Sequence, residues 1–169
     1  MQSLLKIKVC GMKYAANIAR VADLKPDYLG FIFYDKSPRN VSDVSAELIK
    51  YIPKEIKTVG VFVDEDLEKV KRKISDLDLS AVQLHGKESP EYCLALKSEF
   101  SSLELIKAFG VDETFDFVVL ESYEEVVDFF LFDTKISTHG GSGKRFDWTV
   151  LENYKLDKPY FLSGGIDID

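Results

Sequence analysis

Apolar segments recur along this chain at a nearly regular interval, and that spacing constrains the fold more than any other feature. Most of the intervals contain an amphipathic stretch with helical periodicity, as in residues 67–77. Strand and helix alternating at this spacing are typical of parallel strands joined by crossover helices. The strand-like runs end 21 to 30 residues apart, near Val9, Phe33, Val63, Leu84, Ala108, Phe132 and Leu162.

Two architectures use such units: the doubly wound open sheet and the closed eight-stranded barrel. No GxGxxG follows the first strand, so the dinucleotide-binding form of the open sheet lacks its characteristic motif. A barrel needs an eighth strand and helix, about 25–35 residues more, yet the chain stops at Asp169. An uncovered parallel edge invites aggregation. We therefore expect one α/β barrel domain over residues 1–169, with an incomplete C-terminus and the eighth β/α unit missing.

Composition limits the possible partners and the cellular compartment. The net charge of −7 argues against a nucleic-acid or anionic-membrane surface. No run approaches the about 18 apolar residues of a membrane span, and no apolar leader is present. The two cysteines, Cys10 and Cys93, form no disulfide framework, and no residue set has metal-ligand spacing. We expect a cytoplasmic protein with reduced thiols, no metal, and neither nucleic acid nor membrane as a partner.

The candidate site consists of the residues that follow the predicted strands, because in a barrel these residues point into one mouth. They are Cys10, the Ser37-Pro38-Arg39 loop, His85, Asp133, the Gly140-Gly141-Ser142-Gly143-Lys144 loop and Ser163-Gly164-Gly165.

Cys10 stands where the first predicted strand ends, and Gly11 after it lets the backbone turn and a ligand approach. One interpretation is a small buried hydrophobe, the common fate of a free cysteine. The other is a catalytic base. Cys93 falls in the middle of a predicted helix, where we expect a core residue.

Asp133 and Arg39 each allow two interpretations. Asp133 ends an almost wholly apolar strand, residues 129–132, and is either a cap for the next loop or a functional acid. Arg39 follows Pro38 and is either a solvated surface residue or a bidentate clamp on a substrate carboxylate. His85 either lines the mouth or bonds the backbone; these alternatives stay open.

Two glycine-rich segments are candidate phosphate sites. The segment of residues 140–144 resembles a P-loop, but Arg145 stands where that motif needs Ser or Thr, so a flexible lid explains it equally well. Gly164 and Gly165 follow a strand, where side-chain-free backbone exposes N–H groups to a phosphate. An ordinary tight turn is the alternative there.

Taken together and in order, these motifs make the chain resemble the phosphoribosylanthranilate isomerase family over its whole length. The motifs are Lys8-Val9-Cys10-Gly11, Gly30-Phe31-Ile32-Phe33 with Ser37-Pro38-Arg39, Gly60-Val61-Phe62-Val63, Val82-Gln83-Leu84-His85-Gly86, Asp133-Thr134, Gly140-Gly141-Ser142-Gly143-Lys144 with Phe146-Asp147-Trp148, and Leu162-Ser163-Gly164-Gly165.

The resemblance implies a (β/α)₈ barrel that performs an Amadori rearrangement in tryptophan biosynthesis without a cofactor. By resemblance, Asp133 matches the general acid, Cys10 the general base, and Arg39 the residue that holds the anthranilate carboxylate. Gly164 and Gly165 match part of the phosphate site, which the family completes with its eighth strand. We also place His85 among the substrate-binding residues. The expected partner is a small phosphosugar-anthranilate substrate, bound by a monomer or a homodimer.

Two rival functions remain at this point. One is another sugar-phosphate barrel enzyme, which would use a different acid and base and would tolerate replacement of Cys10. The other is a non-catalytic ligand-binding barrel, which would bind the product or its reduced analogue without turnover.

Overall fold

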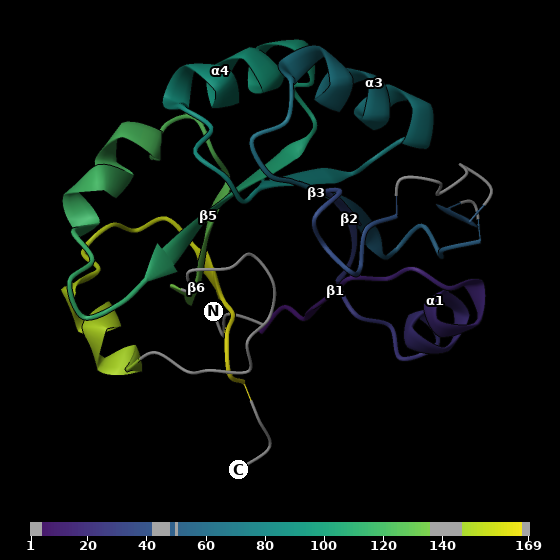
Figure 1. Cartoon of the computed structure of the whole chain (residues 1–169), viewed down its shortest axis with the longest axis horizontal. Helices are drawn as coiled ribbons and strands as arrows, with labels where there is room; N and C mark the ends of the chain where they lie inside the picture. The colour runs from purple at the N-terminus through teal and green to yellow at the C-terminus, as the bar shows by residue number, and fades with distance from the viewer. Residues whose placement is uncertain (1–4, 42–47, 50, 136–146, 167–169) are drawn as a thin grey trace. The chain divides into compact units, whose positions relative to one another are not determined.

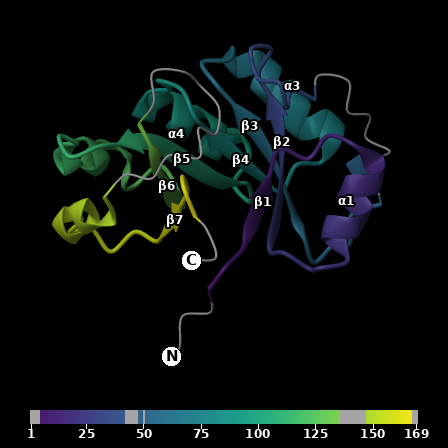
Figure 2. The same cartoon turned by 60° about the horizontal axis from the view of Figure 1, so that its bottom comes forward.

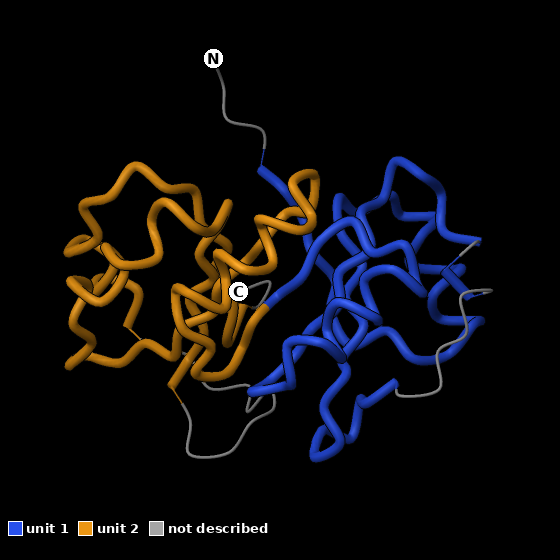
Figure 3. The backbone as a smooth tube through the Cα atoms, turned by 90° about the horizontal axis from the view of Figure 1, so that it is seen from above, with its two compact units in different colours: residues 1–83 blue, residues 84–169 orange. Residues whose placement is uncertain are grey.

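The structure is a computed structural model of the whole chain, and it describes residues 5–41, 48–49, 51–135 and 147–166. The chain divides into two compact units, Met1–Gln83 and Leu84–Asp169, which Figure 3 colours separately. Each unit is described by itself below. The assignment of residues 1–169 to a single domain stays a prediction.

The first unit contains parallel strands that follow one another in chain order. They are β1 (Lys8–Cys10), β2 (Tyr28–Phe33) and β3 (Lys57–Phe62), with β4 (Ala81–Leu84) ending at the boundary to the second unit. β1 pairs with β2 and β2 with β3, both in parallel, as the adjacent ribbons in Figure 2 show. Two helices of this unit are α1 (Ala15–Ala22) and α3 (Leu67–Leu77).

The second unit repeats this alternation with shorter helical segments. Its parallel strands are β5 (Glu104–Val111), β6 (Phe129–Thr134) and β7 (Tyr160–Leu162), paired in that order. Helix α4 (Pro90–Glu99) precedes β5, and the 3₁₀ helices η1 (Phe117–Tyr123) and η2 (Trp148–Asn153) precede β6 and β7 (Figure 1). The alternation of parallel strands and helices predicted from the spacing is therefore confirmed.

Local chemistry explains where the longer helices begin. The Asp66 carboxylate accepts a hydrogen bond from the Lys69 amide at 3.1 Å and caps α3. The Ser89 hydroxyl accepts from the Tyr92 amide at 3.3 Å, and Pro90 occupies the first turn of α4. Both arrangements satisfy amide groups that have no acceptor inside the helix. Among the described residues, no helix has the length and apolar character needed to cross a bilayer.

The core of the first unit is centred on β2, whose six residues are all buried. A strand buried on both faces reads as a continuous apolar run, which is the pattern the sequence shows there. Phe31 is completely buried, and Ile18 and Ala22 of α1 are buried as well. The remainder of α1 is largely exposed, so its buried stripe is narrower than its alanine content suggests.

Ring-to-ring packing organises the core of the second unit. Phe109 on β5 meets the Phe130 ring of β6 at 5.8 Å between centroids and the Tyr123 ring of η1 at 5.4 Å. Phe132 on β6 meets the Tyr154 ring, just after η2, at 5.5 Å. Edge-to-face contacts of this kind stabilise a core beyond the area they bury. The 3₁₀ helices are therefore held to the strands by aromatic side chains.

Truncation of a buried aromatic side chain should destabilise the protein much more than truncation of an exposed one. We expect Phe31→Ala to lower the free energy of unfolding by about 3–5 kcal/mol, because it removes apolar contacts and leaves a cavity. The matched control is Tyr51→Ala, whose side chain is 84% exposed and whose loss should change the free energy by about 0.5 kcal/mol or less. Urea denaturation measures both, and equal losses would contradict the assignment of β2 to the core.

Candidate active site

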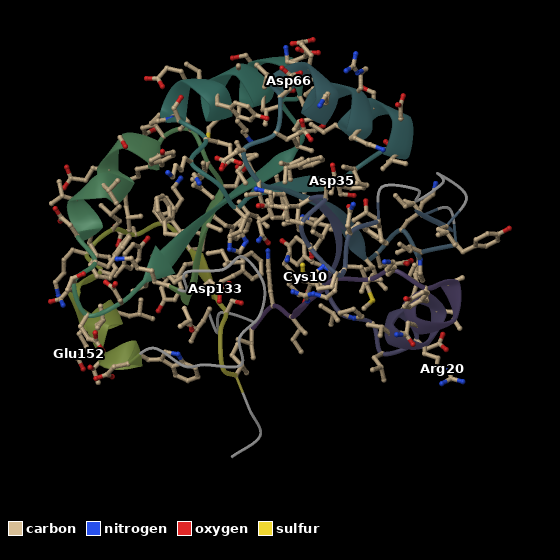
Figure 4. The ribbon with its side chains drawn as sticks, viewed as in Figure 1. Cys10, Arg20, Asp35, Asp66, Asp133 and Glu152 are labelled. Carbon is tan, nitrogen blue, oxygen red and sulfur yellow. The ribbon has the colours of Figure 1, made fainter. Side chains whose placement is uncertain are left out.

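Cys10 ends β1 as a free, partly exposed cysteine. In the parallel register it lies opposite Gly30 of β2, and a Cβ added at Gly30 would come within 2.8 Å of the Cys10 Sγ. Real Cβ atoms do not tolerate such a distance, so the glycine leaves the space that the thiol occupies. Figure 4 shows Cys10 at the strand end, whereas Arg20 projects outward from α1.

Arg39 lies against the backbone that carries the thiol. Its Nη1 donates to the Cys10 carbonyl oxygen at 3.2 Å. Gly11 has a φ of +89°, and a Cβ there would lie 2.6 Å from the same Nη1. The Ser37 hydroxyl accepts from the Arg39 amide at 3.2 Å. The exposed guanidinium, with five N–H donors in all, therefore lies beside the Cys10 backbone.

Asp133 lies within β6, one residue before its end, so the strand continues through Thr134, past the apolar run of residues 129–132. Its Oδ1 accepts from the Thr134 amide at 2.8 Å, and its Oδ2 lies 3.6 Å from the His85 Nε2. That second distance is longer than a hydrogen bond. Both side chains are partly open, with exposed fractions of 29% and 30%. His85 therefore faces the carboxyl group.

The turn after β7 lies directly against Asp133. Gly164 and Gly165 have φ values of +84° and +67°, a conformation that favours glycine. A Cβ at Gly164 would lie 2.8 Å from the Asp133 Oδ1 and closer still to the Thr134 hydroxyl. The Ser163 amide donates to the Phe132 carbonyl at 2.8 Å and holds the turn to β6. Whether the turn binds phosphate stays a prediction.

Each unit by itself brings polar groups together. In the first unit the Arg39 guanidinium binds the carbonyl of Cys10, and in the second unit a carboxyl group lies beside an imidazole and a glycine turn. A thiol and a carboxyl group can transfer protons, and a guanidinium can bind an anion. Figure 4 shows Asp133 on β6 and Glu152 projecting from the outer edge of η2. The Gly140–Lys144 segment lies outside the described residues.

Cys93 behaves as the core residue that its helical position predicts. It is fully buried in α4, and desolvation raises the pKa of its thiol to about 12. Over the described part of the chain, no group of three or more His, Cys, Asp or Glu side chains is arranged to hold a metal ion.

One buried charge pair was not anticipated from the sequence. Lys107 on β5 and Glu88 before α4 have side chains that are 2% and 1% exposed, with 3.2 Å between Nζ and Oε2. The available signal is a lysine inside an otherwise apolar run, residues 105–109. A charge in a buried strand needs a partner, but the sequence does not say which of the many acids provides it.

A family model described as N-(5'phosphoribosyl)anthranilate (PRA) isomerase matches residues 7–169 of this chain. Among curated proteins, the N-(5'-phosphoribosyl)anthranilate isomerase of Parabacteroides distasonis is 46% identical over 162 residues, which cover 95% of this chain and 72% of that enzyme. The corresponding enzyme of Phocaeicola vulgatus is 41% identical over 160 residues, or 95% of this chain and 75% of that enzyme.

Comparison with solved structures shows which fold the chain has. The crystal structure of phosphoribosylanthranilate isomerase from Thermotoga maritima matches with a TM-score of 0.80 and 34% identity, covering 96% of this chain and 78% of that one. A phosphoribosylanthranilate isomerase in complex with reduced 1-(o-carboxyphenylamino)-1-deoxyribulose 5-phosphate matches in fold, with a TM-score of 0.65 and 23% identity, covering 98% and 90%. The predicted α/β class, a (β/α)₈ barrel of which the described residues form seven strands, is confirmed. The chain belongs to the phosphoribosylanthranilate isomerase family.

Proposed function

We propose that this chain converts N-(5-phosphoribosyl)anthranilate to 1-(2-carboxyphenylamino)-1-deoxyribulose 5-phosphate, with Asp133 as general acid and Cys10 as general base. The reaction belongs to tryptophan biosynthesis, as does the family. One observation carries the proposal: within a match of 163 residues, 7–169, a partly exposed thiol and a partly exposed carboxyl group stand at the carboxyl ends of parallel strands. In barrels of this class, that end of the strands carries the chemistry.

The first step opens the sugar ring and needs an acid. The substrate nitrogen pushes its electron pair toward C1, the bond between C1 and the ring oxygen breaks, and Asp133 gives a proton to that oxygen. Asp133 Oδ1 already accepts the Thr134 amide proton. The proton for transfer is therefore assigned to Oδ2, the oxygen near His85. The product of this step is a protonated imine.

The second step moves hydrogen from C2 to C1 and needs a base. The imine makes the C2 proton acidic, and the Cys10 thiolate removes it, so that the electron pair forms a C1–C2 double bond. The resulting enolamine takes up a proton at C1 and loses the proton of its C2 hydroxyl group, which gives the ketone. C1 is reduced while C2 is oxidised within one molecule, so this aldose–ketose isomerisation balances with no cofactor.

Binding of the two anionic ends of the substrate is assigned to groups already near the acid and the base. Arg39, beside Cys10, would bind the anthranilate carboxylate through charge-assisted hydrogen bonds. Gly164 and Gly165 would contribute amide groups to the phosphate site, and His85 would contact the sugar near Asp133. A monomeric or homodimeric state stays a prediction.

Removal of either proton-transfer group should abolish most of the activity. We expect Cys10→Ala and Asp133→Asn each to lower kcat by about 10²–10⁴-fold, the usual contribution of a positioned acid or base. The loss of anthranilate-linked substrate is followed by fluorescence. Cys93→Ala and Asp116→Asn are the matched controls, because each alters the same residue type away from the proposed site. Near-normal kcat in either site variant, with folding intact by circular dichroism, would refute the assignment.

Chemical modification should distinguish the two thiols. Iodoacetamide near pH 8 is expected to label Cys10 and not Cys93, whose raised pKa of about 12 keeps it protonated until the solution is strongly alkaline. Mass spectrometry of peptides locates the label, activity should fall in step with labelling, and the reduced product analogue should slow both. Complete labelling of Cys10 without loss of activity would contradict its role.

Replacement of the guanidinium should affect binding more than chemistry. We expect Arg39→Gln to raise KM by about 10-fold or more, because a hydrogen bond to a charged group contributes about 1.5–3 kcal/mol. Arg20→Gln, at an exposed position on α1, is the control and should leave KM unchanged. Initial rates against substrate concentration give both constants. A fall in kcat at constant KM would assign Arg39 a different role.

A further inference from the structure

The buried Lys107–Glu88 pair lies at the base of the loop that carries His85. The Lys107 Nζ donates to the Gly86 carbonyl at 2.7 Å and lies 3.4 Å from the Leu84 carbonyl. His85 is the residue between those two carbonyls. The ammonium group therefore holds the chain on both sides of the imidazole that faces Asp133.

Glu88 binds the same loop from its other end. Its Oε2 lies 3.2 Å from the Lys107 Nζ and also accepts from the Gly86 amide at 3.0 Å. The Tyr123 hydroxyl on η1 donates to the Glu88 carbonyl at 3.0 Å. Both the amide and the carbonyl of Gly86 are thus bound, one by each member of the pair, which leaves this residue little rotational freedom.

The surroundings of Lys107 exclude a direct chemical role. Its side chain is 2% exposed, and its Nζ lies 5.2 Å from the Phe109 ring centroid and 5.9 Å from the Tyr123 ring centroid. A substrate in solution does not reach an ammonium group covered in this way. Burying an ion pair is also a poor route to stability, because desolvation offsets much of the attraction. The pair therefore calls for a different explanation.

We propose that Lys107 and Glu88 are positioning residues, which fix residues 84–88 so that the His85 imidazole stays against the Asp133 carboxyl group. The inference rests on the proposed function, in which Asp133 is the general acid. Small displacements of a reacting group are costly in rate, so a pair that never touches substrate can still control kcat.

The principal test replaces the pair by apolar side chains of similar size. Lys107→Met combined with Glu88→Met removes both charges together and avoids leaving one charge buried alone. We expect kcat to fall by about 10–100-fold, as for a misplaced catalytic group, with a smaller change in KM. Unchanged kcat in the folded double variant would overturn the proposal.

The pathway of the effect is tested in a His85→Asn background. If the pair acts through His85, the same double replacement causes no further fall in kcat once the imidazole is absent. An equal fall in both backgrounds would overturn the positioning role. Lys97→Met is the matched control, because its Nζ also binds a carboxylate, Asp128 at 2.8 Å, and a backbone carbonyl, Leu103 at 2.9 Å. It should change stability and leave kcat unaltered.

A spectroscopic readout separates this proposal from the proposed function. His85 and His139 are the two histidines of the sequence, and His85→Asn assigns their imidazole NMR signals. In the otherwise unaltered chain, Asp133→Asn should shift the His85 signals, and in the Lys107→Met/Glu88→Met double variant this response should be lost. A response that persists would overturn the positioning role, whatever the activity. Full activity of Asp133→Asn would instead refute the proposed function alone.

A milder variant covers the case in which the double replacement does not fold. Glu88→Gln removes one charge but keeps an acceptor for Lys107 and Gly86. We expect a fall in kcat of about three- to tenfold, as for one weakened hydrogen bond, together with a changed His85 signal. No change in either measurement would overturn the proposal.

Discussion

The parallel pairing of β1 with β2 determines the surroundings of Cys10. Because the register sets Cys10 against Gly30, the space beside the thiol depends on the neighbouring strand having no side chain there. The same strand end supplies the carbonyl that Arg39 binds and the positive φ of Gly11 that admits the guanidinium. Four residues from three chain segments thus meet at this strand end, and a shift of the β1–β2 register would separate Cys10 from Gly30.

The surroundings of Asp133 in the second unit are built in a similar way from different residues. Asp133 is fixed by its own strand through the Thr134 amide, faced by His85 from the end of β4, and covered by Gly164 from the turn after β7. Glycine again permits the close approach. At Gly30 and at Gly164 the missing Cβ leaves the space that the Cys10 thiol and the Asp133 carboxyl group occupy, so each arrangement depends on its glycine as much as on its polar residues.

Much of this arrangement could be predicted from the sequence. The bounds of β2, β4 and β7 follow from dense apolar runs, and the start of α4 follows from Ser89 and Pro90. The contact between His85 and Asp133 could not be predicted, because it depends on how far β6 continues past its apolar run. The pairing of Lys107 with Glu88 could not be predicted either. Hydrophobic periodicity indicates which residues are buried, but it does not indicate which acidic residue pairs with a buried lysine. The motifs and the family resemblance identified the candidate residues, whereas the contacts around each of them are seen only in the structure.

The division of the chain has a spectroscopic consequence. Trp148, the single tryptophan of the sequence, begins η2 in the second unit, and Tyr154 just after η2 packs against Phe132 of β6. Tryptophan emission therefore originates in one unit only, whereas the circular dichroism of helices draws on both. Comparing the two signals during denaturation reveals whether the halves lose their structure in one cooperative event or in separate ones.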